Sequence, residues 1–285
     1  MMQIEKPIFV LGVPHSGTSW LGKAITQDPE IVHIPETNYI WMWGNFKKAD
    51  DTLGEEALTP KIKKHIEQQF VEHLKKHNGK RICDKTPRNC LRIPFIRAVF
   101  PDAKIILITR DGRSVMSSMS KSTTPSKQVI LGTIRSRLKR VPIRDWRFYF
   151  SRASQIVKKR AMGQPLDSWG IRPPGWKEWA GKYSPHMVAA KQWVETIKIA
   201  THEGRKLPPE NYLEVYYENL VNSPQEEMGR IANFVDIKNP HPILEYAVKT
   251  TDPSRIDKWK DLDIDVLNEV RKVIEPTMAE LGYRW

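Results

Sequence analysis

One stretch near the N-terminus constrains the fold of this 285-residue chain more than any other. An apolar run at 8–11 passes directly into a loop of small residues at 12–19, and from Trp20 onward apolar residues recur at helical spacing. A strand, a glycine-bearing loop and a helix in this order are typical of a phosphate-binding loop. The N–H groups of the loop and first helical turn lack intrahelical partners and lie at the positive end of the helix dipole. The stretch predicts an α/β fold, a P-loop-type parallel sheet flanked by helices.

The loop departs from the pattern that binds nucleoside triphosphates, G-x-x-x-x-G-K-[ST]. Gly12, Gly17 and Ser19 hold their places in that pattern, but Thr18 replaces the lysine that reaches the β- and γ-phosphates. The loop is therefore suited to one phosphate group rather than to a triphosphate tail. Further donors to such a group are the side chains of His15, Ser16, Thr18 and Ser19.

Charged residues follow three further segments that we expect to be strands of the same sheet. Glu36 comes after the second strand-like segment, Lys85 after the third, and Arg110 after the fourth, which covers 103–109. Ligands of open parallel sheets lie beyond the carboxyl ends of the strands, so these side chains are expected to face the loop. On position alone, a helix-capping or surface role for Glu36 is an equal alternative, and Lys85 has a surface charge as its alternative.

Arg110 is a candidate for a second phosphate site. Its planar guanidinium matches a phosphate bidentately, and Ser118 lies two helical turns further on, on a face that can look back toward it. The alternative is a salt bridge between Arg110 and Asp111 across the turn.

Composition limits the class of protein and its partners. Hydrophobic residues make up 40% of the chain, enough for a hydrophobic core, and the length allows one large α/β domain or two small ones. We expect a single domain spanning 1–285. The net charge of +13 favours anionic partners such as nucleotides, acidic glycans or nucleic acid. Two cysteines give no metal or disulfide pattern, no run approaches a membrane span, and the N-terminus does not read as a signal peptide. We therefore expect no metal and a cytoplasmic location.

A segment at 121–185 reads as a basic, aromatic-rich helical insert. Between Lys121 and Arg160 the only acidic residue is Asp145, and aromatic residues cluster near the middle. We expect a lid or acceptor-binding insert. Single-stranded nucleic-acid binding and a simple solvated helix face are the alternatives.

The C-terminal part of the chain predicts further helices and one strand. A helix is expected at 186–202 and a strand at 212–217, and Ser223 is expected to cap the next helix. The stretch from Asp236 to Lys260 reads as loop-rich. The final helix, from about Ile264, is expected to be interrupted at Pro276.

Three segments together resemble the sulfotransferases that use 3′-phosphoadenosine 5′-phosphosulfate (PAPS), most of all the tyrosylprotein sulfotransferases. Residues 14–20, PHSGTSW, are similar to that family's 5′-phosphosulfate loop, which adds Trp20 to the cofactor site. Arg110 and Ser118 match the pair that holds the 3′-phosphate. The segment 217–220 is the third similar stretch.

The resemblance implies roles for individual residues. Glu36 occupies the position of the catalytic base, and Lys85 that of a lysine that stabilises the transferring group. Tyr217 matches a tyrosine that contacts the nucleotide. His15 stands where the family usually has Lys or Arg, so its role depends on whether it is charged. A serine or threonine of the C-terminal half is also expected at the site, and the sequence leaves Thr250, Thr251 and Ser254 as candidates.

The resulting hypothesis is in-line sulfuryl transfer from PAPS to an acceptor hydroxyl or amine, without a metal, leaving adenosine 3′,5′-bisphosphate. Lys85, His15 and loop N–H groups would stabilise developing charge, and Asp84 is the second candidate for the base. A P-loop kinase and a basic nucleic-acid-binding protein are the alternative functions. The sequence does not identify the acceptor, although its charge is compatible with an acidic or glycan acceptor, nor does it give the oligomeric state.

Overall fold

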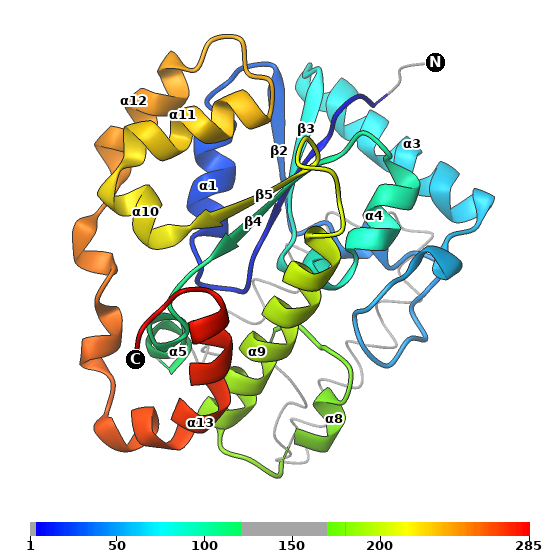
Figure 1. Ribbon diagram of the computed structural model, residues 1–285. Coiled ribbons are helices and arrows are strands. Elements are labelled where there is room, and N and C mark those ends of the chain that lie inside the picture. The colour runs from blue at the N-terminus through cyan, green and yellow to red at the C-terminus, as the bar shows by residue number, and fades with distance from the viewer. Residues whose placement is uncertain (1–3, 121–169, 180) are drawn as a thin grey trace, which may run out of the picture.

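A five-stranded parallel sheet forms the centre of the molecule (Figure 1). The computed structural model describes residues 4–120, 170–179 and 181–285. The strand order is β2-β3-β1-β4-β5, so β1 lies in the middle. From β1 the chain goes to the edge strand β2, returns to β3 beside β1, and then crosses to β4 and β5 on the other side. The strands are β1 (Ile8–Leu11), β2 (Ile31–Pro35), β3 (Arg81–Lys85), β4 (Lys104–Thr109) and β5 (Tyr212–Tyr216). This arrangement confirms the predicted fold class.

Successive residues of the central strands point to opposite faces of the sheet and join two separate hydrophobic clusters. Phe9 and Leu11 belong to one cluster, Ile8 and Val10 to the other. Because both faces are covered by helices, the central strand β1 is apolar along its whole length, and β4 is apolar from Ile105 to Ile108. The first face packs on α2 (Asn38–Trp41), α3 (Pro60–His77) and α4 (Ile93–Val99). The second packs on α1 (Thr18–Ile25), α10 (Tyr217–Asn222), α11 (Pro224–Phe234) and α12 (His241–Thr250).

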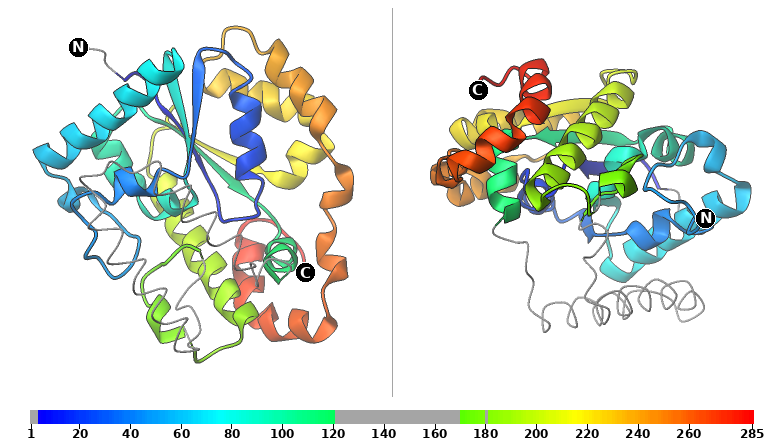
Figure 2. Two further views of the ribbon diagram at one scale, coloured as in Figure 1. Left: turned by 180° about the vertical axis from the view of Figure 1, so that it is seen from behind. Right: turned by 90° about the horizontal axis from the view of Figure 1, so that it is seen from below.

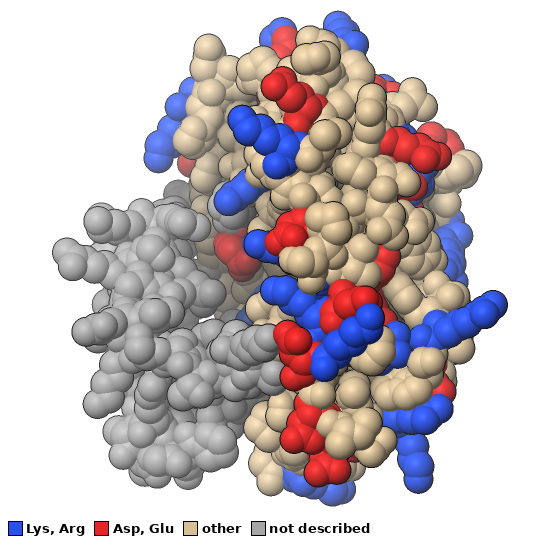
Figure 3. Space-filling model, turned by 90° about the vertical axis from the view of Figure 1, so that its left-hand side faces the viewer, with Lys and Arg blue, Asp and Glu red and all other residues tan. Residues whose placement is uncertain are grey.

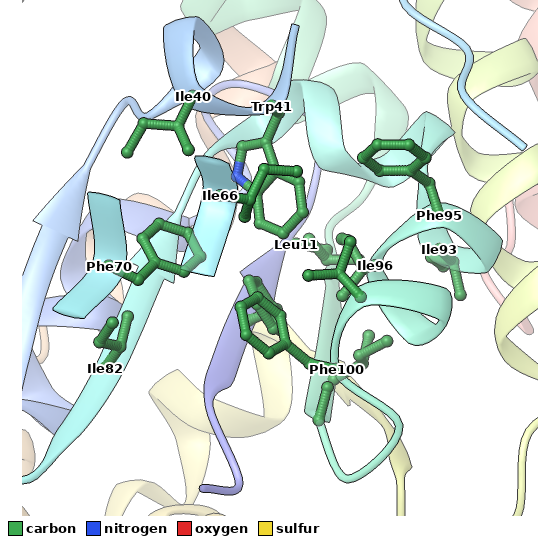
Figure 4. Close-up of a cluster of buried hydrophobic side chains, with 14 of the residues drawn as sticks. Leu11, Ile40, Trp41, Ile66, Phe70, Ile82, Ile93, Phe95, Ile96 and Phe100 are labelled. Carbon is green, nitrogen blue, oxygen red and sulfur yellow. The ribbon is translucent and has the colours of Figure 1, made fainter. Parts of the chain in front are cut away.

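Aromatic rings fill the first cluster (Figure 4). The indole of Trp41 makes edge contacts with the rings of Phe9 and Phe70, each at 5.5 Å between centroids. Trp41 follows β2 by six residues. Its anchoring in the core therefore fixes where the chain leaves that strand.

A third cluster joins three helices beyond the carboxyl edge of the sheet. They are α5 (Gly112–Ser120), α9 (Pro185–Gly204) and α13 (Ile264–Glu280), which lie close together in both views of Figure 2. Val13 of the phosphate-type loop and Trp193 of α9 are both buried in this cluster. The loop therefore has a rigid support behind it. Within the described ranges, the other short helices are η1 (Glu55–Ala57), η2 (Pro87–Leu91), α8 (Trp176–Trp179), η4 (Pro253–Arg255) and η5 (Lys258–Asp261).

Several expectations about the C-terminal part and the helix ends were wrong. The stretch 236–260 contains α12 and two short 3-10 helices instead of loop, and α13 continues through Pro276 without a break. The prediction for α11 is confirmed, because Ser223 is its N-cap residue, although its side chain makes no capping hydrogen bond. Helix α1 begins at Thr18, two residues earlier than predicted. Most of the predicted insert, 121–169 and residue 180, lies outside the described residues.

No helix among the described residues is both long and apolar enough to span a bilayer.

Candidate active site

The predicted site residues meet at one edge of the sheet. Because the five strands are parallel, their carboxyl ends lie together, and the segments after β1, β2, β3, β4 and β5 share this edge. Pro35 pairs with Lys85, so Glu36 and Lys85 emerge side by side. Phe9 pairs with both Asp84 and Ile105, so Lys85 is level with Ile106 and Arg110 leaves β4 further along the strand direction. Because β1 is the central strand, the loop after it lies between the β2–β3 half of the sheet and the β4–β5 half.

The loop after β1 has the backbone geometry of an anion site. His15 and Gly17 both have positive φ, 71° and 95°, and Gly17 is the N-cap residue of α1. Alternating conformations of this kind turn successive N–H groups toward one concavity. A Cβ at Gly17 would lie 2.7 Å from a ring carbon of Tyr217, so only glycine fits there. The hydroxyl of Ser16 is buried and has no hydrogen-bond partner among the described residues, which suits a phosphate ligand.

Glu36 and Lys85 form an ion pair, with 2.8 Å between Oε1 and Nζ. The Lys85 side chain is 9% exposed and that of Glu36 is 47% exposed. Glu36 also has a positive φ of 61°, which is uncommon for a residue with a Cβ. The lysine thus faces inward at the strand end, while the carboxylate is open to an incoming molecule. Lys85 is therefore not a surface charge, whereas Glu36 is exposed and paired with it.

Asp84 cannot act as the base. Its side chain is fully buried, and its two carboxylate oxygens accept hydrogen bonds from Thr37, Trp41 and Thr86. Burial raises the pKa of this carboxyl to about 6, although the three hydrogen bonds act in the opposite direction. The position was predicted as a strand end, but the side chain points into the protein and not toward the crevice.

Arg110 connects the loop to the C-terminal half of the chain. Its NH1 donates to the carbonyl of His15 at 2.9 Å, its NH2 donates to the carbonyl of Arg255, and its guanidinium lies 4.4 Å from the centroid of the Tyr217 ring. Its Nε is buried without a partner among the described residues. The predicted alternative, an Arg110–Asp111 pair, is wrong, because Asp111 pairs with Arg113 at 2.6 Å.

Ser118 lies on α5, and its hydroxyl donates to the carbonyl of Ser114 one turn earlier, at 3.0 Å. The structure therefore puts Ser118 on the helix that follows Arg110 without a hydrogen bond between the two in the described contacts. Ser114 instead makes the longer-range contact: its hydroxyl donates to the carbonyl of Ile256 at 2.8 Å.

His15 lies in an environment that disfavours the imidazolium. Burial lowers its pKa below the usual 6.5, and the neighbouring charges of Arg110 and Lys258 lower it further. These effects favour the neutral imidazole over the imidazolium. Lys258 is far from His15 in the sequence, so its closeness to the loop is information that the fold adds.

A contact with Trp20 distinguishes one of the three candidate hydroxyl residues, Thr250, Thr251 and Ser254, from the other two. Its Nε1 donates to Oγ1 of Thr250 at 2.9 Å, and its ring lies 6.4 Å from that of Tyr246. The hydroxyl of Thr251 donates back to a carbonyl of α12, and that of Ser254 donates to Asp252. Thr250 is therefore the candidate that contacts a residue of the loop helix.

Within the described ranges, no His, Cys, Asp and Glu side chains gather into a group of three that could hold a metal ion.

Sequence comparison identifies relatives of the chain. The curated relatives include a putative protein-tyrosine sulfotransferase of Caenorhabditis briggsae, 22% identical over 86% of this chain and 71% of that protein. Protein-tyrosine sulfotransferase A of Caenorhabditis elegans is 24% identical over 98% of this chain and 60% of its own length. Protein-tyrosine sulfotransferase 1 of Homo sapiens is 24% identical over 97% of this chain and 69% of its own length. The chain thus spans about two thirds of these relatives.

Solved structures share the fold. The sulfotransferase domain of the curacin biosynthetic pathway superposes with a TM-score of 0.59 at 17% identity, over 99% of each chain. The sulfotransferase domain of the Synechococcus PCC 7002 olefin synthase gives 0.56 at 17% identity, also over 99% of each. The family model described as "Sulfotransferase family" matches residues 7–164 and 170–241, most of the chain, and the protein therefore belongs to the sulfotransferase family.

Proposed function

We propose that this sulfotransferase moves the sulfuryl group of PAPS to an acceptor hydroxyl, with Glu36 as the base that takes the hydroxyl proton. Family membership supports the reaction class and the donor. The observation that carries the assignment of the base is the 2.8 Å pair of Glu36 and Lys85 at the edge that also holds the phosphate-type loop. The open position of the Glu36 carboxylate supports access by an acceptor.

The pair suggests how the base becomes available. In the protein without ligand, Lys85 is neutralised by Glu36. A sulfuryl group beside Lys85 offers the ammonium a second anion, which frees the carboxylate to accept a proton. The acceptor oxygen then forms a bond to sulfur while the bond from sulfur to the 5′-phosphate oxygen breaks. The proton ends on Glu36, and adenosine 3′,5′-bisphosphate leaves.

The buried, unpartnered atoms fit a nucleotide with two separated phosphates. Ser16, with the loop N–H groups and the hydroxyls of Thr18 and Ser19, would hold the 5′-phosphate. Arg110 would hold the 3′-phosphate, and Ser118 would join it by turning its hydroxyl away from Ser114. Aromatic contacts with the adenosine would come from Trp20 and Tyr217.

The alternative functions have less support. Thr18 stands at the loop position where a P-loop kinase has the lysine that contacts the β- and γ-phosphates. On the face shown in Figure 3, acidic and basic side chains of the described residues are interspersed. Ion pairs such as Arg255–Asp252 and Lys260–Asp257 neutralise part of the positive charge in the C-terminal part.

Two measurements test the proposal. Calorimetric titration should show tight binding of adenosine 3′,5′-bisphosphate, but not of ATP or 5′-AMP. Glu36→Gln should reduce turnover of PAPS by about 10² to 10⁴-fold while leaving bisphosphate affinity unchanged, because the base contributes to the transition state and not to nucleotide binding. Near-normal turnover in this variant would remove Glu36 from the role. Preference for ATP would refute the donor.

The acceptor is proposed only as a class. The net charge of +13 supports an acidic or glycan-like acceptor, and the curated relatives are named for protein tyrosine. A screen with PAPS should therefore compare tyrosine peptides rich in acidic residues, acidic glycans and simple phenols.

A cytoplasmic location remains a prediction. It is supported by Cys83 and Cys90, which are both free thiols and buried. Cell fractionation tests it.

A further inference from the structure

The backbone at Glu36 is held in an unfavourable conformation from the neighbouring strand. A φ of 61° is costly for a residue with a side chain and persists only where surrounding contacts impose it. The N–H of Glu36 donates to the carbonyl of Lys85 at 3.0 Å, and the N–H of Thr37 donates to Oγ1 of Thr86 at 2.9 Å. Both amides at this bend are therefore tied to the end of β3.

Asp84 holds the side chains that make these ties. Its Oδ1 accepts the hydroxyl of Thr86 at 2.6 Å. Its Oδ2 accepts the hydroxyl of Thr37 and also the indole N–H of Trp41, the latter at 2.7 Å. All four side chains are fully buried. We call this group of Asp84, Thr37, Thr86 and Trp41 the Asp84 bracket.

We propose that Asp84 is a positioning residue of this active site, whose carboxylate fixes Thr37 and Thr86 so that the Glu36 carboxylate and the Lys85 ammonium are held for sulfuryl transfer. The inference rests on the proposed role of Glu36. Asp84 itself does not contact substrate, because its side chain is fully buried and its oxygens are occupied by protein donors.

The burial of this carboxylate argues for a geometric role. A carboxylate removed from water is costly, and an apolar side chain of similar size would fill the same space at lower cost. Only acceptor oxygens can hold two hydroxyls and an indole N–H in a fixed arrangement. That arrangement spans the ends of β2 and β3, where the two proposed catalytic residues emerge. Trp41 extends the bracket into the aromatic cluster, so the geometry is anchored to the core.

A matched pair of variants at Thr86 tests the bracket. Thr86→Val keeps the shape but removes the acceptor for the Thr37 amide, whereas Thr86→Ser keeps the hydroxyl. We expect kcat with PAPS to fall about 10²-fold in Thr86→Val, since small displacements of catalytic groups have effects of that size. It should stay within about 3-fold in Thr86→Ser. The dissociation constant of adenosine 3′,5′-bisphosphate should change less than about 3-fold in both variants.

A second pair separates acceptor geometry from charge. Asp84→Asn keeps one acceptor oxygen for Thr37 and Trp41, and its amide can donate to Thr86 if that hydroxyl reverses. Asp84→Ala removes every acceptor. We expect Asp84→Asn to retain at least tenfold more kcat than Asp84→Ala. If Asp84→Ala does not fold, the Thr86 pair decides alone.

The outcomes distinguish this inference from the proposed base. If Glu36→Gln is inactive while Thr86→Val is fully active, the proposed role of the Asp84 bracket is overturned and the role of Glu36 as base stands. Glu36→Gln fully active would overturn the base, and the bracket with it. A parallel loss of bisphosphate affinity and kcat in Thr86→Val would mean that the bracket only supports the fold, and would also overturn the inference.

Discussion

His15 occupies the loop position at which the resembling enzymes usually carry Lys or Arg, and positive charge surrounds its imidazole. Burial, Arg110 and Lys258 together lower its pKa below 6.5, so the cationic form appears only as the pH falls. A cation here would stabilise charge on the leaving phosphate. We therefore expect kcat for sulfuryl transfer to rise as the pH is lowered from 8 toward 6.

Two substitutions at His15 check this prediction. His15→Lys supplies a permanent cation and should raise kcat at pH 7.5 by roughly tenfold and flatten the profile between pH 6 and 8. His15→Asn tolerates the positive φ of this position and carries no charge, so it should remain slow across the same range. A rising profile that persists in His15→Asn would assign the pH dependence to another group.

Among the elements, the loop after α2 is joined to η2 and to the chain that precedes α8 through one buried carboxylate. The Asp51 side chain is 0% exposed and accepts from the guanidinium groups of Arg88 and Arg172, each at 2.7 Å. Its Oδ2 also accepts from the backbone N–H of Arg172 at 2.9 Å, and the N–H of Asp51 donates to the carbonyl of Arg172 at 2.8 Å. Burial alone would raise the pKa of Asp51, but Arg88, Arg172 and Arg92 outweigh it and lower the value to about 2. The three segments are therefore clamped by charge.

Removing this carboxylate should destabilise the protein in a pH-dependent way. A carboxyl whose pKa is depressed in the fold contributes stability above its unfolded pKa and loses it as the pH falls toward the folded value. Asp51→Asn should therefore lower the free energy of unfolding by about 2 kcal/mol at pH 7, and this difference should disappear between pH 4 and pH 2. Urea denaturation measures it. Asp50→Asn is the control, since its carboxylate contacts only Thr52 among the described residues. An equal loss in both variants would contradict the clamp.

The elements differ in how far the sequence could predict them. The segments of β1 and β4 were recognisable because apolar residues run unbroken along them, and their strand ends led directly to Arg110. Helix α12 was missed because proline precedes it and only Ile243 and Ala247 are buried, so its packing on α11 stabilises it more than its own pattern. Helix α13 continues past Pro276 because Ile274 and Met278 pack on α9 on either side of it.

The candidate site residues also differ in how far the sequence could predict them. Glu36 and Lys85 could be predicted from strand ends because parallel strands align them. The contact of Arg110 with the carbonyl of Arg255, 145 residues away, could not be, because no local pattern encodes a partner at that separation. The inward direction of the Asp84 side chain could not be predicted either, since it depends on Thr37, the N-cap residue of α2.

At the scale of the whole molecule, the proposed nucleotide site joins the first and last thirds of the chain. Besides the contact from Arg110, Ser114 of α5 holds the carbonyl of Ile256 at 2.8 Å, and the Arg113 guanidinium lies 4.2 Å from the Trp259 ring. A bisphosphate bound at the loop and at Arg110 would therefore restrain the segment 252–262 as well as the loop. A ligand that binds only the folded state stabilises it by about 2.7 kcal/mol at a concentration 100 times its dissociation constant.

We expect adenosine 3′,5′-bisphosphate to raise the melting temperature and to slow amide hydrogen exchange both at 12–19 and at 255–259. The reason is that the two segments meet at Arg110, so ordering one orders the other. Arg110→Ala should remove the protection at 255–259 and weaken binding, while Lys272→Ala, on the exposed side of α13, should change neither. Protection confined to 12–19 would show that the ligand engages the loop without the proposed 3′-phosphate contact. Equal protection by 5′-AMP would show the same, because that nucleotide has no 3′-phosphate for Arg110 to hold.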